Sequence, residues 1–342
     1  MKTTFKLLMT VFLAFKCTLP AFEYLEKIEP KQKIVTATKR LIFENSAGAY
    51  NPSITKFKDN YLMTFRWSPN RLAEPWVSFI GFVLLDKNFD PLTKAELLDT
   101  RIYNNTTPSQ AEDARVFCIG DKYYVVYNDN MDLTFPSTWE RRDMYIAEII
   151  HENDHIYLGK PLRLVHERKI RDRPWQKNWS PFEYNGKLLL SYSIKPHEIL
   201  EPNLTTGICK AVYETEKDFI WNYDAPRGGT PSALIDGEYL SFFHSGTIHR
   251  TPSSEFYDIW HYYMGAYTFS ASPPFAITKI SSEPINHPEF YTYSHYSKRV
   301  IYPGGFVVDG ANLYLSYGKD DCEIWIATID LEELKKSLVN VK

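Results

Sequence analysis

Apolar and polar residues alternate in short runs along this chain, and many runs end at tight-turn residues such as Asn, Asp, Gly or Lys. Such alternation is typical of half-buried strands, and two runs joined by a tight turn predict a β-hairpin. The hairpin pattern occurs five times, as NPSITKFKDNYLMTFRW from Asn51, EDARVFCIGDKYYVVYND from Glu112, NWSPFEYNGKLLLSYSI from Asn178, GGTPSALIDGEYLSFFHS from Gly228 and YPGGFVVDGANLYLSYGK from Tyr302. The chain therefore contains a five-fold internal repeat.

A second β-rich stretch follows each hairpin, for example RDMYIAEII from Arg142 and CEIWIATIDL from Cys322. Two hairpins per repeat make a four-stranded blade, and five blades arranged radially leave only short sheet edges. We expect an all-β fold, a five-bladed β-propeller with four-stranded blades, as one domain over residues 22–342. No long amphipathic helical pattern lies between the strands, so we expect helix only as a short C-terminal helix over residues 331–339 and a short N-terminal piece.

The N-terminus has the pattern of a signal peptide over residues 1–21. Lys2 and Lys6 form a basic end, residues 7–15 are apolar, and Ala21 is a cleavage candidate. The apolar run is too short to span a bilayer. We therefore expect an exported protein, periplasmic or secreted, without an integral membrane span once the signal is removed.

The amino-acid composition limits the classes of ligand that the protein is expected to bind. The 39 basic and 42 acidic residues give a formal net charge of -3, so no overall positive field attracts nucleic acid. The 24 Tyr, 21 Phe and 8 Trp residues suit either β-sheet cores or stacking on sugar rings. The cysteines outside the signal, Cys118, Cys209 and Cys322, are widely spaced, and no metal-ligand pattern is present, so we expect no metal site.

The first strand of each blade lines the centre of a propeller, so residues at the repeat starts should converge on one cavity. The second repeat begins with Glu112 and Asp113, followed by Arg115. A carboxylic acid in this place can donate a proton to a glycosidic oxygen. Equally, it can accept backbone hydrogen bonds and pair with Arg115.

Three basic or hydrogen-bonding side chains lie near the ends of other repeats. Arg66 ends the first repeat, Lys177 precedes the third and His244 ends the fourth. Together they predict a pocket for phosphate or a sugar carboxylate. The basic segment 166–177, which contains Trp175, is either a solvated loop or a rim that attracts an anionic ligand.

The five repeat starts together resemble glycoside hydrolase family 130 over roughly residues 48–334. The motifs concerned are AYNPSI with LMTFR, AEDARVF, KNWSPFEYNGKLLLSYS, GGTPSALIDGEYLSFFHS, YPGGFVVDGANLYLSYGKDD and IATIDLEEL. The resemblance implies an inverting reaction on a β-mannoside within an oligosaccharide or glycoconjugate, without a cofactor. Asp113 matches the proton donor, and inorganic phosphate is a candidate co-substrate.

The resemblance also implies roles for other residues. Arg66, Lys177 and His244 match phosphate-binding positions, whereas Asn51, Arg115, Tyr317 and Asp321 match motif positions that contact the sugar or support the site. A hydrolase of this kind would need a second carboxylate to activate water. Glu183 in the third repeat is the candidate for that base, although it can equally be a structural hydrogen-bond acceptor.

Several alternatives stay open because the chain departs from the family pattern, with Ala114, Asn178 and Ser245 at motif positions. The acceptor can be phosphate, water or a sugar, the last making the protein a mannosyltransferase. A retaining glycosidase like families 32, 43 and 68 is disfavoured, because residues 49–57 contain no carboxylate nucleophile. A propeller that binds carbohydrate without catalysis is the alternative from another class.

Overall fold

The computed structural model describes residues 33–69, 77–101, 109–130, 142–153, 155–168, 175–250, 255–292 and 298–342. The expected signal peptide, residues 1–21, lies outside these ranges, and so does part of the basic segment 166–177. Within the described ranges no helix is both long enough and apolar enough to cross a membrane. The structure is mostly β, with one short helix near the C-terminus.

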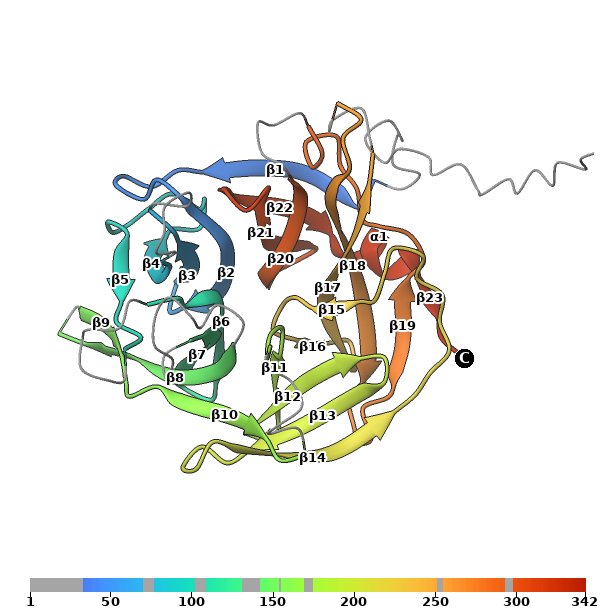
Figure 1. The fold of residues 1–342 in the computed structure, drawn as a ribbon, viewed down its shortest axis with the longest axis horizontal. Helices are drawn as coiled ribbons and strands as arrows, with labels where there is room; N and C mark the ends of the chain where they lie inside the picture. Colours follow the sequence, from blue (N-terminus) through green and yellow to red (C-terminus); the bar gives the residue numbers. More distant parts are fainter. Residues whose placement is uncertain are drawn as a thin grey trace, which may run out of the picture.

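The strands form three hydrogen-bonded sheets of ten, nine and four strands around a common centre (Figure 1). Along the chain they follow one another in five groups of mainly antiparallel strands, and parallel pairs of β10 with β14 and of β18 with β20 join neighbouring groups within the two larger sheets. Group one contains β2 (Ala49–Phe57), β3 (Asn60–Trp67), β4 (Phe79–Leu85) and β5 (Glu96–Leu98). Group two contains β6 (Glu112–Ile119), β7 (Lys122–Asp129), β8 (Asp143–Glu152), β9 (His155–Leu158) and β10 (Leu162–His166), the last two both pairing with β8. Group three contains β11 (Ser180–Tyr184), β12 (Lys187–Ile194), β13 (His197–Pro202) and β14 (Ile208–Thr215).

The last two groups complete the ring. Group four contains β15 (Arg227–Gly228), β16 (Ala233–Ile235), β17 (Glu238–His249), β18 (Ile259–Ser270) and β19 (Ile277–Ser281). Group five contains β20 (Lys298–Asp309), β21 (Asn312–Lys319), β22 (Glu323–Asp330) and the N-terminal strand β1 (Val35–Leu41). Because β1 pairs with β22 antiparallel, the first described strand is hydrogen-bonded to the last strand group.

The five predicted hairpins are confirmed. They are β2–β3, β6–β7, β11–β12, β16–β17 and β20–β21, each in antiparallel register. In Figure 1 the first strand of each pair lies near the centre, and later strands of the group lie farther out. Residues that begin the repeats therefore approach one another, although they lie far apart in the sequence.

The hydrophobic core is divided into five clusters among the described residues, each between two neighbouring groups. Leu62 and Val116 belong to the cluster between groups one and two, and Val126 and Leu190 to the next. The remaining clusters join groups three and four, four and five, and five and one. Face-to-face packing of apolar residues thus holds the groups together, since hydrogen-bonded pairing alone does not link all of them.

The helix α1 (Leu331–Ser337) is shorter than expected. The side chain of Asp330 accepts hydrogen bonds from the backbone N–H groups of Glu332 and Glu333 and so caps its first turn. Our prediction that the helix extends to residue 339 is wrong, because β23 (Leu338–Asn340) pairs with β19 instead.

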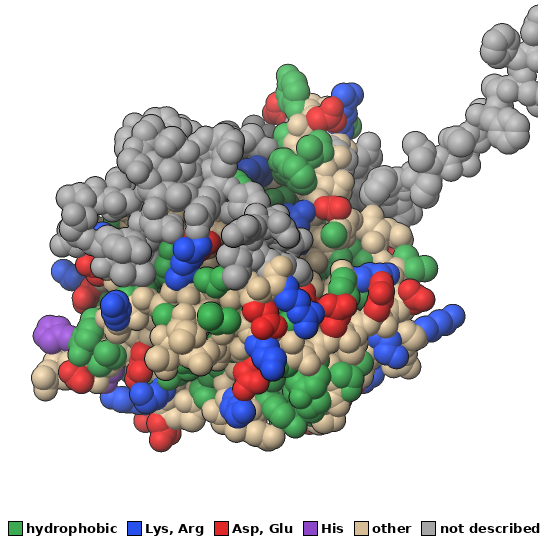
Figure 2. All heavy atoms as spheres, turned by 60° about the horizontal axis from the view of Figure 1, so that its bottom comes forward, with side chains coloured by type: hydrophobic (Ala, Val, Ile, Leu, Met, Phe, Trp, Pro, Cys, Tyr) green, Lys and Arg blue, Asp and Glu red, His purple; other side chains and the backbone are tan. Residues whose placement is uncertain are grey.

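The surface charge is mixed. Figure 2 shows Lys and Arg side chains lying among Asp and Glu side chains over the face that it presents. This distribution agrees with the small formal net charge of -3. A site for an anion on this protein therefore depends on charges gathered locally.

Candidate active site

A cavity of about 470 Å³ lies where residues of groups one, two, four and five meet the segment just before group three. Polar and charged side chains form most of its wall. Its lining consists of Tyr50, Asn51, Arg66, Glu112, Asp113, Trp175, Lys177, Asn178, Arg227, His244, Tyr262, Lys298, Tyr302 and Asp321. The structure therefore brings together six of the nine residues that the sequence predicted for the site, namely Asn51, Arg66, Asp113, Lys177, His244 and Asp321.

Bulges at the inner strands explain why neighbouring residues share this wall. Side chains along a regular strand point alternately to opposite faces. The register between β6 and β7 shifts between Glu112 and Arg115, and Asp113 has a positive φ of 54°. Asn51 on β2 has a φ of 49° within a corresponding shift. The bulge breaks the alternation, so both Glu112 and Asp113 line the cavity.

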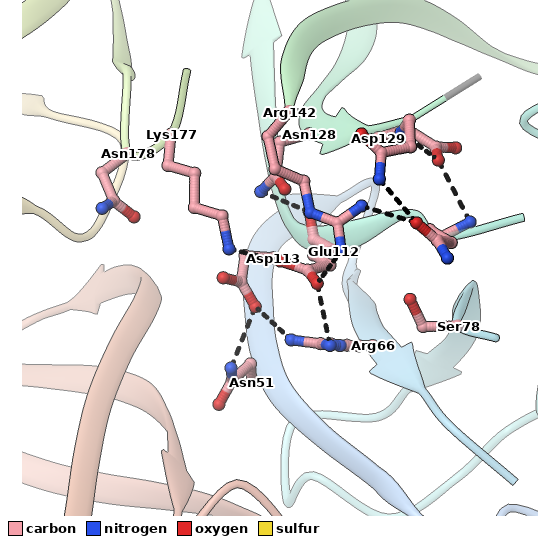
Figure 3. A network of polar contacts seen from close by, with 12 residues as sticks. Asn51, Arg66, Ser78, Glu112, Asp113, Asn128, Asp129, Arg142, Lys177 and Asn178 are labelled. Atoms are coloured by element: carbon pink, nitrogen blue, oxygen red, sulfur yellow. Dashed lines mark hydrogen bonds and ion pairs between the residues drawn. The ribbon is translucent and has the colours of Figure 1, made fainter. Parts of the chain in front are cut away.

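Asp113 is held through one of its two carboxylate oxygens. The side-chain amide of Asn51 donates a hydrogen bond of 2.9 Å to Oδ1, and Arg66 NH1 lies 3.9 Å from the same atom. The second oxygen points away from both residues (Figure 3). Asp113 therefore lines the cavity with one oxygen fixed by Asn51 and Arg66 and the other directed away from them.

Glu112 is the anionic centre of a buried charge cluster. Its carboxylate lies 3.0 Å from Arg66 NH2, 3.2 Å from Arg142 NH2 and 2.7 Å from Lys177 Nζ. Burial alone would raise the pKa of Glu112, but the three cations together lower it to about 2. Glu112 is thus ionised at neutral pH and is not suited to donate a proton.

His244 lies between two aromatic rings, 4.7 Å from Tyr302 and 5.9 Å from Tyr262 between ring centroids. Burial lowers its pKa well below the usual value, and Arg227, Arg115 and Lys177 lower it further. We expected a group that is either cationic or a hydrogen-bond donor. The neutral imidazole supplies a hydrogen bond but no charge.

Arg115 supports the cavity from outside its lining. Its guanidinium donates hydrogen bonds to the carbonyl oxygens of Asp113, Gly228 and Gly229 and to the hydroxyl of Tyr302. A further bond of 3.2 Å reaches the side chain of Asn178. Arg115 is only 1% exposed and ties the walls of four strand groups together, so it holds the site in shape without facing the cavity.

Two predicted residues lie elsewhere. Glu183 lines a separate cavity of about 490 Å³, together with Cys118 and Tyr184. Tyr317 is fully buried in the core, with its ring 5.0 Å from that of Phe290. Neither residue is positioned by this structure to contact a ligand in the charged cavity.

Asp321 does line the cavity, where it pairs with Lys298 at 2.9 Å. Sequence reasoning overlooked Lys298 and Tyr262, which carried no motif signal. Arg227 and Tyr302 could have been found, because Arg227 immediately precedes the fourth repeat as Lys177 precedes the third, and Tyr302 starts the fifth. The described residues contain no group of three His, Cys, Asp or Glu side chains arranged to hold a metal ion.

Comparison with known proteins assigns the chain to a family. The model of a glycoside hydrolase family, described as β-1,4-mannooligosaccharide phosphorylase, matches residues 18–340. The chain belongs to glycoside hydrolase family 130. The resemblance seen in the five repeats is thereby confirmed, and the protein is an enzyme of a glycoside phosphorylase and hydrolase family. A search of curated proteins gives no match.

Solved structures share the fold of this family 130 protein at low sequence identity. A candidate glycoside hydrolase from Parabacteroides distasonis matches with a TM-score of 0.64 and 15% identity, covering 84% of this chain and 88% of its own. The β-1,2-mannobiose phosphorylase of Listeria innocua matches with 0.59 and 16%, covering 92% and 96%. A mannose phosphorylase of Leishmania mexicana matches with 0.55 and 11%, covering 90% and 92%.

Proposed function

We propose that this family 130 enzyme cleaves β-mannosides by inverting phosphorolysis. One observation carries the proposal: Asp113 on β6, Arg66 on β3 and Lys177 just before β11 line the same cavity. A proton donor and cations for an anionic nucleophile are the two parts that such a reaction requires.

In the proposed reaction, Asp113 Oδ2 transfers its proton to the glycosidic oxygen as the bond from that oxygen to the anomeric carbon breaks. A phosphate oxygen forms the new bond to the anomeric carbon from the opposite face, so the β-mannoside gives α-mannose 1-phosphate and a free sugar. Arg66 and Lys177 hold the phosphate by charge-assisted hydrogen bonds, and the neutral ring of His244 can add a hydrogen bond.

The same scaffold supports our proposal that the fold is a five-bladed β-propeller. Five strand groups surround one centre, and each of the five core clusters lies between two neighbouring groups. The pairing of β1 with β22 would then fasten the ring, as closure of a propeller requires.

A hydrolytic reaction receives less support. Glu183, the expected base, lines the other cavity. The carboxylates that accompany Asp113, namely Glu112 and Asp321, are both engaged in ion pairs. Phosphorolysis needs no second carboxylate, because phosphate itself is the nucleophile.

The relatives suggest which linkages to test. The family description names β-1,4-mannooligosaccharides, and the Listeria protein acts on β-1,2-mannobiose. The protein should be incubated with both series, with and without inorganic phosphate, and the products should be separated into mannose 1-phosphate and free mannose. We expect mannose 1-phosphate to form only with phosphate. Free mannose appearing at the same rate without phosphate would establish a hydrolase, and no turnover of any mannoside would favour a binding protein.

We also propose that residues 1–21 direct export. The basic start and the short apolar run support this. Fusing residues 1–21 to a reporter that is active only outside the cytoplasm should give signal, and replacing residues 7–15 by polar residues should abolish it. Equal signal from the two fusions would contradict export.

A further inference from the structure

Glu112 has no step of its own in the proposed reaction, yet it is one of the most tightly held residues of the cavity. Its side chain is 1% exposed and forms ion pairs with cationic side chains from three separate parts of the chain. Arg66 comes from β3, Arg142 from the residue before β8, and Lys177 from the segment before β11. Burying a carboxylate costs free energy, so its partners have to compensate it.

The two oxygens of Glu112 divide these partners between them. Oε1 accepts a hydrogen bond from Arg66 and forms an ion pair with Arg142, whereas Oε2 accepts a hydrogen bond from Lys177 (Figure 3). The carboxylate therefore fixes the distance between Arg66 and Lys177, the two cations that also line the cavity. Without it, the like charges would repel one another, and Lys177 has a long side chain with many rotamers to lose on binding an anion.

The charges of the cluster also match the anion. Arg66, Arg142 and Lys177 carry three positive charges, of which Glu112 cancels one. The proposed reaction requires Asp113 to carry its proton when phosphate binds, and in that form Asp113 adds no charge. The remaining two positive charges equal in magnitude the two negative charges of the hydrogen phosphate ion. Bound phosphate would therefore neutralise the net charge of these four side chains.

We infer that Glu112 is a positioning residue for the phosphate nucleophile, which holds Arg66 and Lys177 in their binding geometry before the anion enters. This inference rests on the proposed phosphorolysis. Glu112 acts through the two cations and does not itself touch the reacting atoms, so its loss should affect phosphate more than the glycoside.

The test compares Glu112→Gln and Glu112→Asp with the unaltered protein. KM is measured separately for phosphate and for the glycoside, and binding of inorganic phosphate is measured by calorimetry. Because hydrogen bonds between charged groups are lost, we expect Glu112→Gln to raise the KM for phosphate roughly 10- to 100-fold, while the KM for the glycoside stays within about twofold. Glu112→Asp keeps the charge but is one methylene shorter, so it should recover part of the loss.

Glu198→Gln is a matched control. Glu198 is also a buried carboxylate in an ion pair, 2.9 Å from His166 Nε2, but it does not line the cavity. It should change neither KM. If Glu112→Gln does not fold, a selective rise in the phosphate KM of Glu112→Asp still decides the question.

The outcomes separate the two hypotheses. If the unaltered protein binds phosphate and both Glu112 variants bind it equally well, the inference is overturned and phosphorolysis stands. Equal rises of both KM values in the Glu112 variants overturn it as well. If the unaltered protein takes up no phosphate and turns over glycoside without it, phosphorolysis fails, and the role of Glu112 fails with it.

Discussion

Replacement of Asp113 by Asn tests the proton donor while keeping the shape of the side chain. In the native structure Oδ1 accepts the hydrogen bond of 2.9 Å from Asn51 and lies 3.9 Å from Arg66 NH1. The amide oxygen of Asn can accept the same hydrogen bond, and its amide nitrogen takes the place of Oδ2. The principal change is the loss of a transferable proton, so folding and sugar binding should be preserved.

The expected size of the effect follows from this geometry. Loss of general acid catalysis lowers kcat about 100- to 10,000-fold, which corresponds to roughly 3 to 5 kcal/mol of activation free energy. This applies to a manno-oligosaccharide, whose leaving oxygen needs the proton. A dinitrophenyl β-mannoside transfers its mannosyl group to phosphate and releases dinitrophenolate, a stabilised anion that needs no proton, so its turnover should fall far less.

The assay is a phosphate-dependent rate measurement with both substrates, supported by a thermal unfolding curve of Asp113→Asn. Near-normal turnover of the oligosaccharide would remove Asp113 from the mechanism. Equal losses with both substrates, in a variant that is folded, would show that Asp113 contributes something other than the proton.

Three further predictions concern other parts of the chain. Trp175 lines the cavity and is 44% exposed, so its ring is accessible for stacking on a sugar. Trp175→Ala should raise the KM for the glycoside about two- to tenfold, which corresponds to the loss of one aromatic stacking contact. An unchanged KM would exclude stacking on the sugar. A Cβ at Gly304 on β20 would lie 1.9 Å from the carbonyl oxygen of Pro52 on β2. Gly304→Ala should therefore lower the free energy of unfolding, measured by urea titration, by about 1 to 3 kcal/mol. An equally stable variant would show that β2 and β20 can move apart at this contact without cost. Burial raises the pKa of Asp129 from 3.8 to about 7, so the native protein should lose stability as the pH rises from about 4 to 7. Asp129→Asn should remove that loss, up to roughly 4 kcal/mol, and parallel pH profiles of the two proteins would contradict the assignment.

The local structure was readable from the sequence. Alternation with a period of two and a tight turn are properties of neighbouring residues, and they located all five hairpins. The repeat also aligned Asn51, Asp113 and Lys177 at corresponding places, which is why their convergence on one cavity could be predicted. The C-terminal helix was placed correctly at Leu331, but its end was not, because pairing of β23 with β19 decides it.

The bulges were not readable from the sequence. A shift of one residue changes the face to which every following side chain points, and so the sequence could not show that Glu112 and Asp113 share a wall. Nor could it show that Glu183 lines a different cavity or that Tyr317 lies in the core, because both depend on how distant strands pack together.

The amino-acid sequence by itself determined the strands, their five-fold recurrence and the family, because these depend on the order of residues along the chain. Only the tertiary structure decided the electrostatic state of the site. Glu112 is ionised because Arg66, Arg142 and Lys177 surround it. His244 is neutral because it is buried close to positively charged side chains. Protonation depends on desolvation and on distances between charges, and those distances exist only after distant segments have packed together.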